Sequence, residues 1–169
     1  MTIRVCVPKE VRAGEQRVAM VPDVVKRLTA LGISVSIQTG AGEAAGHGDS
    51  DYTGADIVSD EAALYASADI LLTVNPLSNE QIEQLKPGSI VIGYLNPYSD
   101  TDRFKRLQEK NISAFSMEMI PRISRAQAMD ALSSQASIAG YKAVLIASTL
   151  LGKFFPMLTT AAGTVRPSK

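Results

Sequence analysis

The sequence has little of several things that would assign it to a specialised class of protein. It has one cysteine and one histidine in 169 residues, and its 17 basic and 17 acidic residues leave no net charge at pH 7. The lone Cys6 excludes an internal disulfide and is typical of a reducing compartment. One histidine and one cysteine are too few ligands for the usual zinc site, so we expect no metal. The absence of excess positive charge argues against a nucleic-acid partner.

Long apolar runs are also absent. The N-terminal stretch MTIRVCVPKE lacks the apolar core of a secretory signal peptide. The most apolar run, residues 143–152, is shorter than the roughly 20 residues that a membrane-spanning helix needs. No internal repeat or low-complexity segment is present. Since 46% of the residues are apolar and 20% are charged, the composition is that of an ordinary globular domain with its own core.

Short β-rich runs alternate with helical patterns along most of the chain. Strands are predicted at residues 3–8, 35–39, 55–58, 68–74, 89–95 and 112–117. Helices are predicted at residues 20–32, 59–68, 78–88, 99–111 and 134–155. This alternation predicts an α/β fold with a Rossmann-like, open, mostly parallel sheet, helices on both of its faces, and a long C-terminal helix. Ser78 and Gln81 stand at capping-box spacing at the start of the third helix.

The C-terminal part has a different pattern. The helix over residues 134–155 is apolar on nearly all sides, with Ile138, Tyr141, Leu145 and Leu150 among its residues. Such a helix must be covered on all faces, and one small domain covers only about half of it. We therefore expect a second domain or another subunit to pack there.

The predicted organisation has three parts. Residues 1–133 form the Rossmann-like domain, and residues 134–155 form the long helix, which leads toward a second domain absent from this sequence. Residues 156–169 combine small residues with Pro167 and are typical of a linker.

A glycine-rich stretch at residues 39–51, TGAGEAAGHGDSD, follows a predicted strand. Gly40, Gly42 and Ala45 have the spacing of a dinucleotide-binding fingerprint, and Asp60 stands about twenty positions after it. The fingerprint also needs a helix directly after the glycines, and three more glycines with several turn-forming residues disfavour one here. We therefore favour a loop over a phosphate cradle, with His47 as an exposed loop residue.

Residues 119–135, MIPRISRAQAMDALSSQ, are a stronger candidate. Pro121 ends the preceding strand, so the segment lies where a parallel strand gives way to a helix, at the edge where open α/β sheets bind ligands. Gln127 can donate to and accept from a carboxamide, Arg122 and Asp130 can pair or each contact one side of that amide, and Ser133 adds a hydroxyl. The alternative is a solvated loop with an Arg–Asp surface pair, in which serines cap the helix.

The N-terminal stretch PKEVRAGEQRVAMVP is the other polar cluster. Its residues Lys9, Glu10, Glu15 and Arg17 surround the end of the first predicted strand. A carboxylate and a guanidinium here could bind a substrate or lock the loop, and the sequence does not separate these two roles.

Four segments together resemble a known family: VPKEVRAGEQRVAMVPDVVKRL, TGAGEAAG, PRISRAQAMDALSSQASIAGYKAV and TAAGTV. They are similar to the N-terminal domain of the α subunit of proton-translocating NAD(P) transhydrogenases, a domain shared more loosely with alanine dehydrogenase. The resemblance covers essentially the whole chain. The segment PRISRAQAMDALSS resembles the transhydrogenase branch specifically.

The resemblance implies a function. The α subunit binds NAD(H), a partner subunit holds NADP(H), and hydride passes from NADH to NADP⁺, coupled to proton movement through a membrane part. By resemblance, Arg122 and Gln127 fix the nicotinamide carboxamide while Asp130 and Ser133 orient the ring, and no residue of this chain is catalytic. The implied partners are a missing second domain that binds NAD, the membrane transhydrogenase subunits, and a second copy in a homodimer. The implied location is the cytoplasmic side of the inner membrane, held through those partners.

Differences from alanine dehydrogenase bear on a second hypothesis for the function. Alanine dehydrogenases resemble this chain but have a lysine after a strand that reads LLKV and a histidine at the end of the next strand. This chain has LLTVN there, with Thr73 and Asn75, and then YLNP, with Asn96. Without that cation and proton donor, a substrate domain of an amino-acid dehydrogenase is disfavoured. A non-catalytic assembly module, suggested by the apolar helix, is the third hypothesis. As a lone first domain the chain is expected to be inactive.

Overall fold

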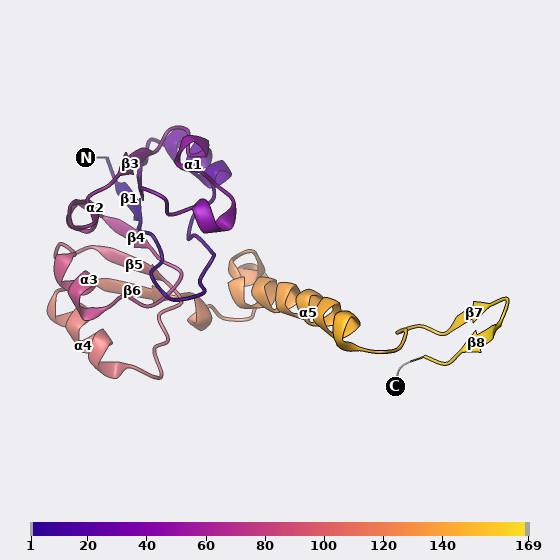
Figure 1. The fold of residues 1–169 in the computed structure, drawn as a ribbon. Coiled ribbons are helices and arrows are strands. Elements are labelled where there is room, and N and C mark those ends of the chain that lie inside the picture. The colour runs from indigo at the N-terminus through magenta and orange to yellow at the C-terminus, as the bar shows by residue number, and fades with distance from the viewer. Residues whose placement is uncertain (1, 168–169) are drawn as a thin grey trace. The chain divides into compact units, whose positions relative to one another are not determined.

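The computed structural model describes residues 2–167 (Figure 1). Its internal contacts divide the chain into two compact units, Met1–Pro121 and Arg122–Lys169, called unit 1 and unit 2 below. The candidate segment at residues 119–135 therefore belongs mostly to unit 2.

Unit 1 is built on one six-stranded sheet with strand order β3-β2-β1-β4-β5-β6. Every neighbouring pair is parallel, which confirms the predicted Rossmann-like architecture. The strand order reverses direction between β1 and β4, so the switch point of the sheet lies between these two strands. The strands are β1 (Arg4–Val7), β2 (Ser34–Gln38), β3 (Asp56–Val58), β4 (Ile70–Leu72), β5 (Ile90–Gly93) and β6 (Ser113–Ser116).

Four helices connect these strands, each within a range predicted from sequence: α1 (Pro22–Ala30), α2 (Glu61–Ser67), α3 (Asn79–Gln84) and α4 (Thr101–Glu109). The predicted capping box is present at α3, where the Ser78 hydroxyl accepts from the Gln81 N–H at 3.2 Å and the Gln81 side-chain carbonyl accepts from the Ser78 N–H at 2.9 Å. The Asp60 side chain caps α2 by accepting from the Ala63 N–H. Local sequence therefore determines where these short helices begin.

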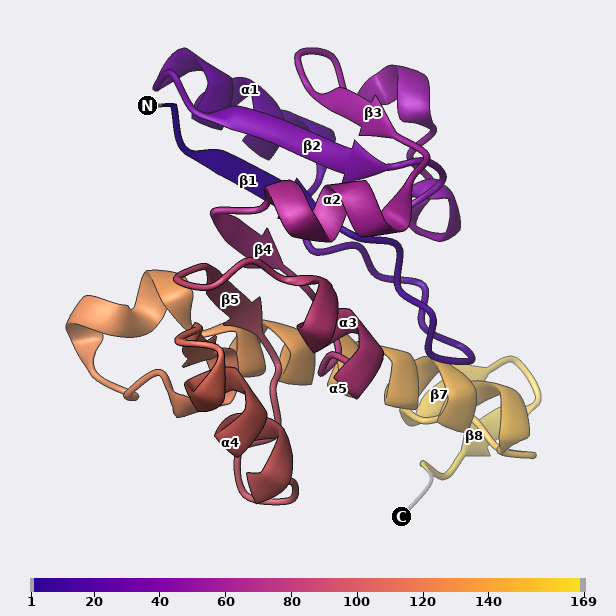
Figure 2. The ribbon, with the colours of Figure 1, turned by 90° about the vertical axis from the view of Figure 1, so that its left-hand side faces the viewer.

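The helices cover opposite faces of the sheet because successive strand residues point to opposite sides. Val5 and Val7 of β1 pack in a cluster with Val25 of α1, whereas Cys6 between them packs in a second cluster with Leu64 and other residues of α2–α4. Figure 2 shows α1 and α2 on opposite sides of β1 and β2. The buried thiol of Cys6 is part of this core, and its burial raises the pKa of the thiol.

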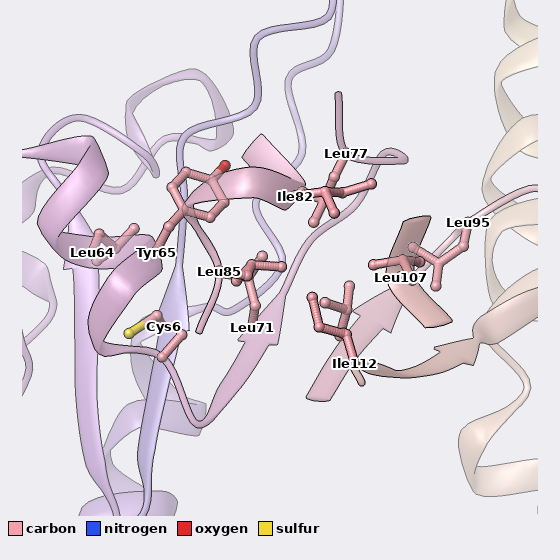
Figure 3. Close-up of a cluster of buried hydrophobic side chains, with 12 residues drawn as sticks. Cys6, Leu64, Tyr65, Leu71, Leu77, Ile82, Leu85, Leu95, Leu107 and Ile112 are labelled. Atoms are coloured by element: carbon pink, nitrogen blue, oxygen red, sulfur yellow. The ribbon is translucent and has the colours of Figure 1, made fainter. Parts of the chain in front are cut away.

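The second cluster is the larger of the two (Figure 3). Leu71 of β4 and Val91 of β5 are fully buried beneath α2, α3 and α4. Each such aliphatic side chain contributes about 1.5–3 kcal/mol when it leaves water, which favours the parallel register observed. These buried clusters hold the strands of unit 1 in place. The polar loops begin where the strands end.

Unit 2 contains the 3₁₀ helix η4 (Ser124–Met129), the helix α5 (Ala131–Leu150) and the antiparallel hairpin β7 (Leu158–Thr160) and β8 (Gly163–Val165). The helix predicted at 134–155 begins three residues earlier and ends five residues earlier. Asp130 caps it at the start, and Leu151 leaves helical geometry immediately before Gly152, a poor helix former. None of its residues is buried, so the covering surface inferred from its sequence stays a prediction. Within residues 2–167, no helix has the length and apolar character to cross a bilayer.

Candidate functional site

The four predicted site residues lie close together in the chain at the entrance of α5. Arg122 and Gln127 are exposed, and Asp130 and Ser133 stand at the first turn of the helix. Between them η4 is held by backbone bonds, with the Ala126 N–H donating to the Ile123 carbonyl at 2.9 Å. Ala126 is the buried residue of this segment. The loop therefore has a defined backbone and outward-facing polar side chains.

Asp130 is the most constrained of the four. One carboxylate oxygen accepts from the Ser133 N–H at 3.0 Å and the other accepts from the Ser133 hydroxyl at 2.6 Å. The Ser133 hydroxyl, then the Ser133 N–H, and more weakly the charge of Arg122 hold the pKa of Asp130 below its usual value. Asp130 therefore stays ionised at neutral pH as the N-cap of α5.

Other pairings considered for this loop are not formed. Among residues 122–167, no ion pair joins Arg122 to Asp130, so the guanidinium acts on that carboxylate only at longer range. The serine-capping alternative is wrong in detail, because Asp130 is the cap and Ser134 only donates to the Asp130 carbonyl at 3.3 Å. The exposed Gln127 side chain suits a carboxamide, because it offers both a donor and an acceptor.

In unit 1, Glu10 is the centre of a hydrogen-bond network at the switch point. Its carboxylate accepts from the Val74 N–H at 2.6 Å, the Thr73 hydroxyl at 3.1 Å, and Asn75 through both the backbone N–H at 3.2 Å and the side-chain amide at 2.8 Å. These bonds tie the loop after β1 to the loop after β4, about 65 positions along the chain. Of the two roles left open for this cluster, Glu10 performs the locking one.

Glu15 and Arg17 extend this network. The Glu15 carboxylate accepts from Arg17 Nε at 2.8 Å, from Arg17 Nη2 at 2.7 Å and from the Asn75 amide at 3.0 Å. The bond to Arg17 is the main reason that the pKa of Glu15 falls from its ordinary 4.5 to about 2. The Arg17 guanidinium also lies 5.8 Å from the centre of the Tyr94 ring, at cation–π distance.

Asn75 and Asn96 occupy the two positions at which alanine dehydrogenases are expected to have a lysine and a histidine. The Asn75 side chain donates to both Glu10 and Glu15, and its carbonyl oxygen accepts from Arg12 at 3.3 Å. Asn96 has a φ of 53° and its backbone N–H donates to Glu118. Both asparagines thus serve the local fold, and neither supplies a charge.

The glycine-rich segment is a loop. It contains two single-turn 3₁₀ helices, η1 (Glu43–Ala45) and η2 (Asp49–Asp51), and no α-helix begins within residues 39–51. A side chain at Gly42 would collide with the Tyr52 hydroxyl, so packing against Tyr52 requires glycine there. The Gly40 N–H donates to Asp49 at 2.8 Å and is thereby already bonded. The preference for a turn over a phosphate cradle is supported by this geometry.

Sequence reasoning missed two residues whose roles depend on contacts between distant parts of the chain. Thr73 is notable in the sequence only as a departure from alanine dehydrogenases, yet it is buried and bonds both Glu10 and the Asn75 carbonyl. Tyr65 has the pattern of an ordinary core residue, but it lines a pocket beside this network. The order of the strands could have indicated them. The polar loops that follow two adjacent parallel strands meet at one edge of the sheet.

Known proteins are similar to this chain over nearly its whole length. The family described as "Alanine dehydrogenase/PNT, N-terminal domain" matches residues 6–139. NAD(P) transhydrogenase subunit alpha from Cereibacter sphaeroides is 41% identical over 169 residues, covering 99% of this chain and 32% of the relative. NAD(P) transhydrogenase subunit alpha from Haemophilus influenzae is 38% identical over 163 residues, covering 96% of this chain and 32% of the relative. The chain thus spans about a third of the length of these relatives.

Solved structures agree with this. A transhydrogenase from Sinorhizobium meliloti matches with a TM-score of 0.89 and 38% identity, covering 97% of this chain and 49% of the other. An L-alanine dehydrogenase matches with a TM-score of 0.66 and 26% identity, covering 70% of this chain and 33% of the other. The similarity to the transhydrogenase extends further along the chain than the similarity to the alanine dehydrogenase.

Proposed function

Because the chain belongs to the alanine dehydrogenase/PNT N-terminal domain family, we propose that it is a segment of the NAD(H)-binding component of an NAD(P) transhydrogenase. The observation that carries the proposal is the 41% identity, across 99% of the chain, to a protein named NAD(P) transhydrogenase subunit alpha. Oxidoreductase chemistry follows from the family. Hydride transfer from NADH to NADP⁺, its coupling to proton translocation, and NADP(H) on a partner subunit are the finer points of the proposal.

The loop before α5 is proposed to hold the nicotinamide end of NAD(H). Gln127 would bond the carboxamide from both sides, and the Arg122 guanidinium would donate to its carbonyl oxygen. The fixed Asp130–Ser133 pair, bonded at 2.6 Å, would set one edge of the ring. The cofactors supply the hydride chemistry, so the contribution of these residues is orientation and the exclusion of water.

The rest of the nucleotide is proposed to bind outside this sequence. The matched region makes up only 32% of each of the two relatives, which leaves room for a second domain with its own phosphate-binding loop. The proposed assembly adds membrane transhydrogenase subunits and a second copy of the NAD(H)-binding subunit, located on the cytoplasmic side of the inner membrane. On this proposal the 169-residue chain alone has no transhydrogenase activity.

Asp130→Asn separates the proposed role from a structural one. Asparagine is as good an N-cap as aspartate, so the start of α5 should be kept while the charge is lost. In a longer protein that contains the second domain, Asp130→Asn and Arg122→Ala should weaken NADH binding or slow hydride transfer to NADP⁺. Arg27→Ala, an exposed arginine of α1, serves as the control. Unchanged kinetics in both loop variants would contradict the assignment of this loop.

NADH binding to the 169-residue chain itself is the simplest test of whether most of the nucleotide site lies outside this sequence. We expect no binding by fluorescence or calorimetry, and restored binding when the chain is extended beyond Lys169. Micromolar binding by the short chain would instead mean that a whole nucleotide site lies within it.

A substrate domain of an amino-acid dehydrogenase is the second candidate, favoured by the family description and the alanine dehydrogenase match. Against it, Asn75 and Asn96 supply neither the cation nor the proton donor that a keto acid needs. Alanine-dependent formation of NADH by the longer protein would support it. The exposed apolar residues of α5 favour a third role, an assembly module, which is compatible with the first.

A further inference from the structure

Unit 1 contains a pocket of about 230 Å³ at the switch point of its sheet. Its walls are the loop after β1, the loop after β4, and side chains from α2, α3 and α4. Open parallel sheets bind ligands at this place, where the strand order reverses. None of the residues proposed to hold the nicotinamide lines it. The pocket is smaller than the roughly 300–1,000 Å³ typical of drug-sized ligands, so it suits a small molecule and not a dinucleotide.

Tyr65 gives the pocket a polar group that the protein does not satisfy. Its side chain is fully buried, and its hydroxyl has no hydrogen-bond partner among the described residues. The Gln81 side chain lies close enough to oppose the rise in the pKa of the phenol, but it makes no bond of good geometry to the Tyr65 hydroxyl. It donates instead to Glu61 at 3.4 Å and accepts from the Ser78 N–H at 2.9 Å. Figure 3 shows the hydroxyl oxygen pointing away from Cys6 and Leu71, out of the apolar cluster. A buried polar atom without a partner is rare and calls for a ligand or water.

The protonation state of Tyr65 makes it a donor. Burial, followed by the charges of Glu61 and Glu10, raises the pKa of the phenol well above its ordinary value. The hydroxyl is therefore neutral at physiological pH and offers its proton to an acceptor in the pocket.

Cationic side chains outnumber anionic ones in the lining of the pocket, while the charges of Glu61 and Glu10 both act on Tyr65. Three of its lining residues are cationic, namely Lys9, Arg12 and Arg103, and one is anionic, Glu10. The Glu10 carboxylate already accepts four hydrogen bonds from the β4 loop. Arg103 is paired with Asp100 at 2.8 Å. Arg12, by contrast, bonds only the neutral Asn75 side chain at 3.3 Å and forms no ion pair within the described residues, so its guanidinium is available.

We propose that this pocket binds a small oxyanion, a phosphate or a short carboxylate, between the Arg12 guanidinium and the Tyr65 hydroxyl. Arginine presents parallel N–H donors that match the two oxygens of such a group. The phenol donates a further bond from the floor of the pocket. Binding needs neither NAD(H) nor a second domain, so this proposal and the proposed function can fail independently.

The test uses the full 169-residue chain and two probes, inorganic phosphate and succinate, each at about 10 mM against sodium chloride of equal ionic strength. A ligand that binds only the folded state raises the unfolding midpoint, by an amount that grows with the logarithm of its concentration relative to its Kd, and calorimetry gives that Kd. We expect one or both probes to stabilise the chain where chloride does not. Tyr65→Phe and Arg12→Gln should each weaken binding about tenfold, whereas Arg27→Gln on α1 should leave it unchanged. The more strongly bound probe identifies the class of anion.

Tyr65→Phe should fold normally, because it removes only an unpaired hydroxyl, and circular dichroism checks this. In the unsubstituted chain, the amide NMR signals of residues 10–12 and 73–75 should shift with the stabilising probe. No binding of either anion would mean that the pocket holds water alone, and the proposal would be wrong. Equal binding by all three variants, or a loss in Arg12→Gln but not in Tyr65→Phe, would place the anion on the outer surface and would equally overturn it.

Discussion

The two units of this chain treat their apolar residues in opposite ways. In unit 1, strands and helices bury Leu71, Val91 and their neighbours in two clusters on the two faces of the sheet. In unit 2, Ala126 alone is buried among residues 122–167, while Tyr141 and Leu150 of α5 are 71% and 80% exposed. Unit 1 buries most of the apolar residues of its strands, whereas unit 2 leaves the apolar residues of α5 exposed to solvent.

Because of this difference, the polar loops of unit 1 and the exposed helix of unit 2 suit different kinds of binding site. Unit 1 is stabilised from within, so its polar loops can be held in place by bonds such as those of Glu10. The α5 helix exposes many apolar residues, and large exposed apolar surfaces are typical of interaction sites, in line with the predicted covering surface. The candidate nicotinamide loop stands at the start of that helix, and its position depends on local caps.

The largest contrast should appear when the same substitution is made in both units. Leu71→Ala, in the core of the sheet, should lower the free energy of unfolding by about 2–5 kcal/mol, because it leaves a cavity. Leu150→Ala, at the exposed end of α5, should change it by less than about 0.5 kcal/mol. Urea unfolding of the 169-residue chain, followed by circular dichroism, measures both. Similar losses in the two variants would mean that α5 is packed in solution, and the comparison would fail.

A smaller loss is expected at the loops of unit 1. Glu10→Gln should lower the free energy of unfolding by about 1.5–3 kcal/mol, since it removes a charged acceptor and places an N–H₂ group among N–H donors. Glu109→Gln, on the exposed face of α4, is the matched control and should have little effect. If the two substitutions behaved alike, the network at the switch point would not hold the loops as described.

At the start of α5 the effect should be local. Asp130→Ala removes the N-cap and should speed amide hydrogen exchange at residues 131–134, while Asp130→Asn should leave that exchange nearly unchanged. The amides of unit 1 should not respond to either variant. Equal exchange in both variants would show that the helix start does not need the cap, and so would remove the structural basis for the loop.

The smallest expected effect depends on pH. The carboxyl of Glu15 should titrate with a pKa of about 2 in the folded chain, instead of its ordinary 4.5, because it accepts from Arg17. A depressed pKa means that its contribution to stability is complete above about pH 4.5 and is lost as the pH falls toward about 2. NMR titration of the carboxyl gives the midpoint, and Arg17→Ala should move it upward. A midpoint at the ordinary value in the unsubstituted chain would show that the pair does not form in solution.

The sequence predicts much of the fold because local rules determine it. Apolar runs locate the six strands, and Ser78 with Gln81 marks the start of α3 correctly. The prediction for α5 is less accurate at its ends, since all-round apolar character gives no information on boundaries, whereas Asp130 and Gly152 do. The hairpin at residues 158–165 lies within the segment interpreted as a linker, where its short strands carry no apolar run.

The candidate site is predictable only in part. The residue types at Arg122, Gln127, Asp130 and Ser133 suggest a carboxamide site, and their place at the start of α5 follows from the local pattern, but their role stays a prediction. The contacts of Glu10 with the residues after β4 could not be read from spacing, because they join positions more than sixty residues apart. Such contacts follow from the pairing of β1 with β4 and become visible only when that pairing is known.

The pairing of β1 with β4 also has a kinetic consequence. Val5 lies opposite Ile70, so the chain must close a loop of about 65 residues before the centre of the sheet exists. Chains dominated by such distant pairings fold slowly, commonly in milliseconds to seconds, whereas a helix of about 20 residues forms within about a microsecond. A chain that refolds from the unfolded state therefore passes through a period in which the sheet is still unformed. During that period its apolar surface is open to other chains, so rapid dilution or a chaperone should raise the refolding yield.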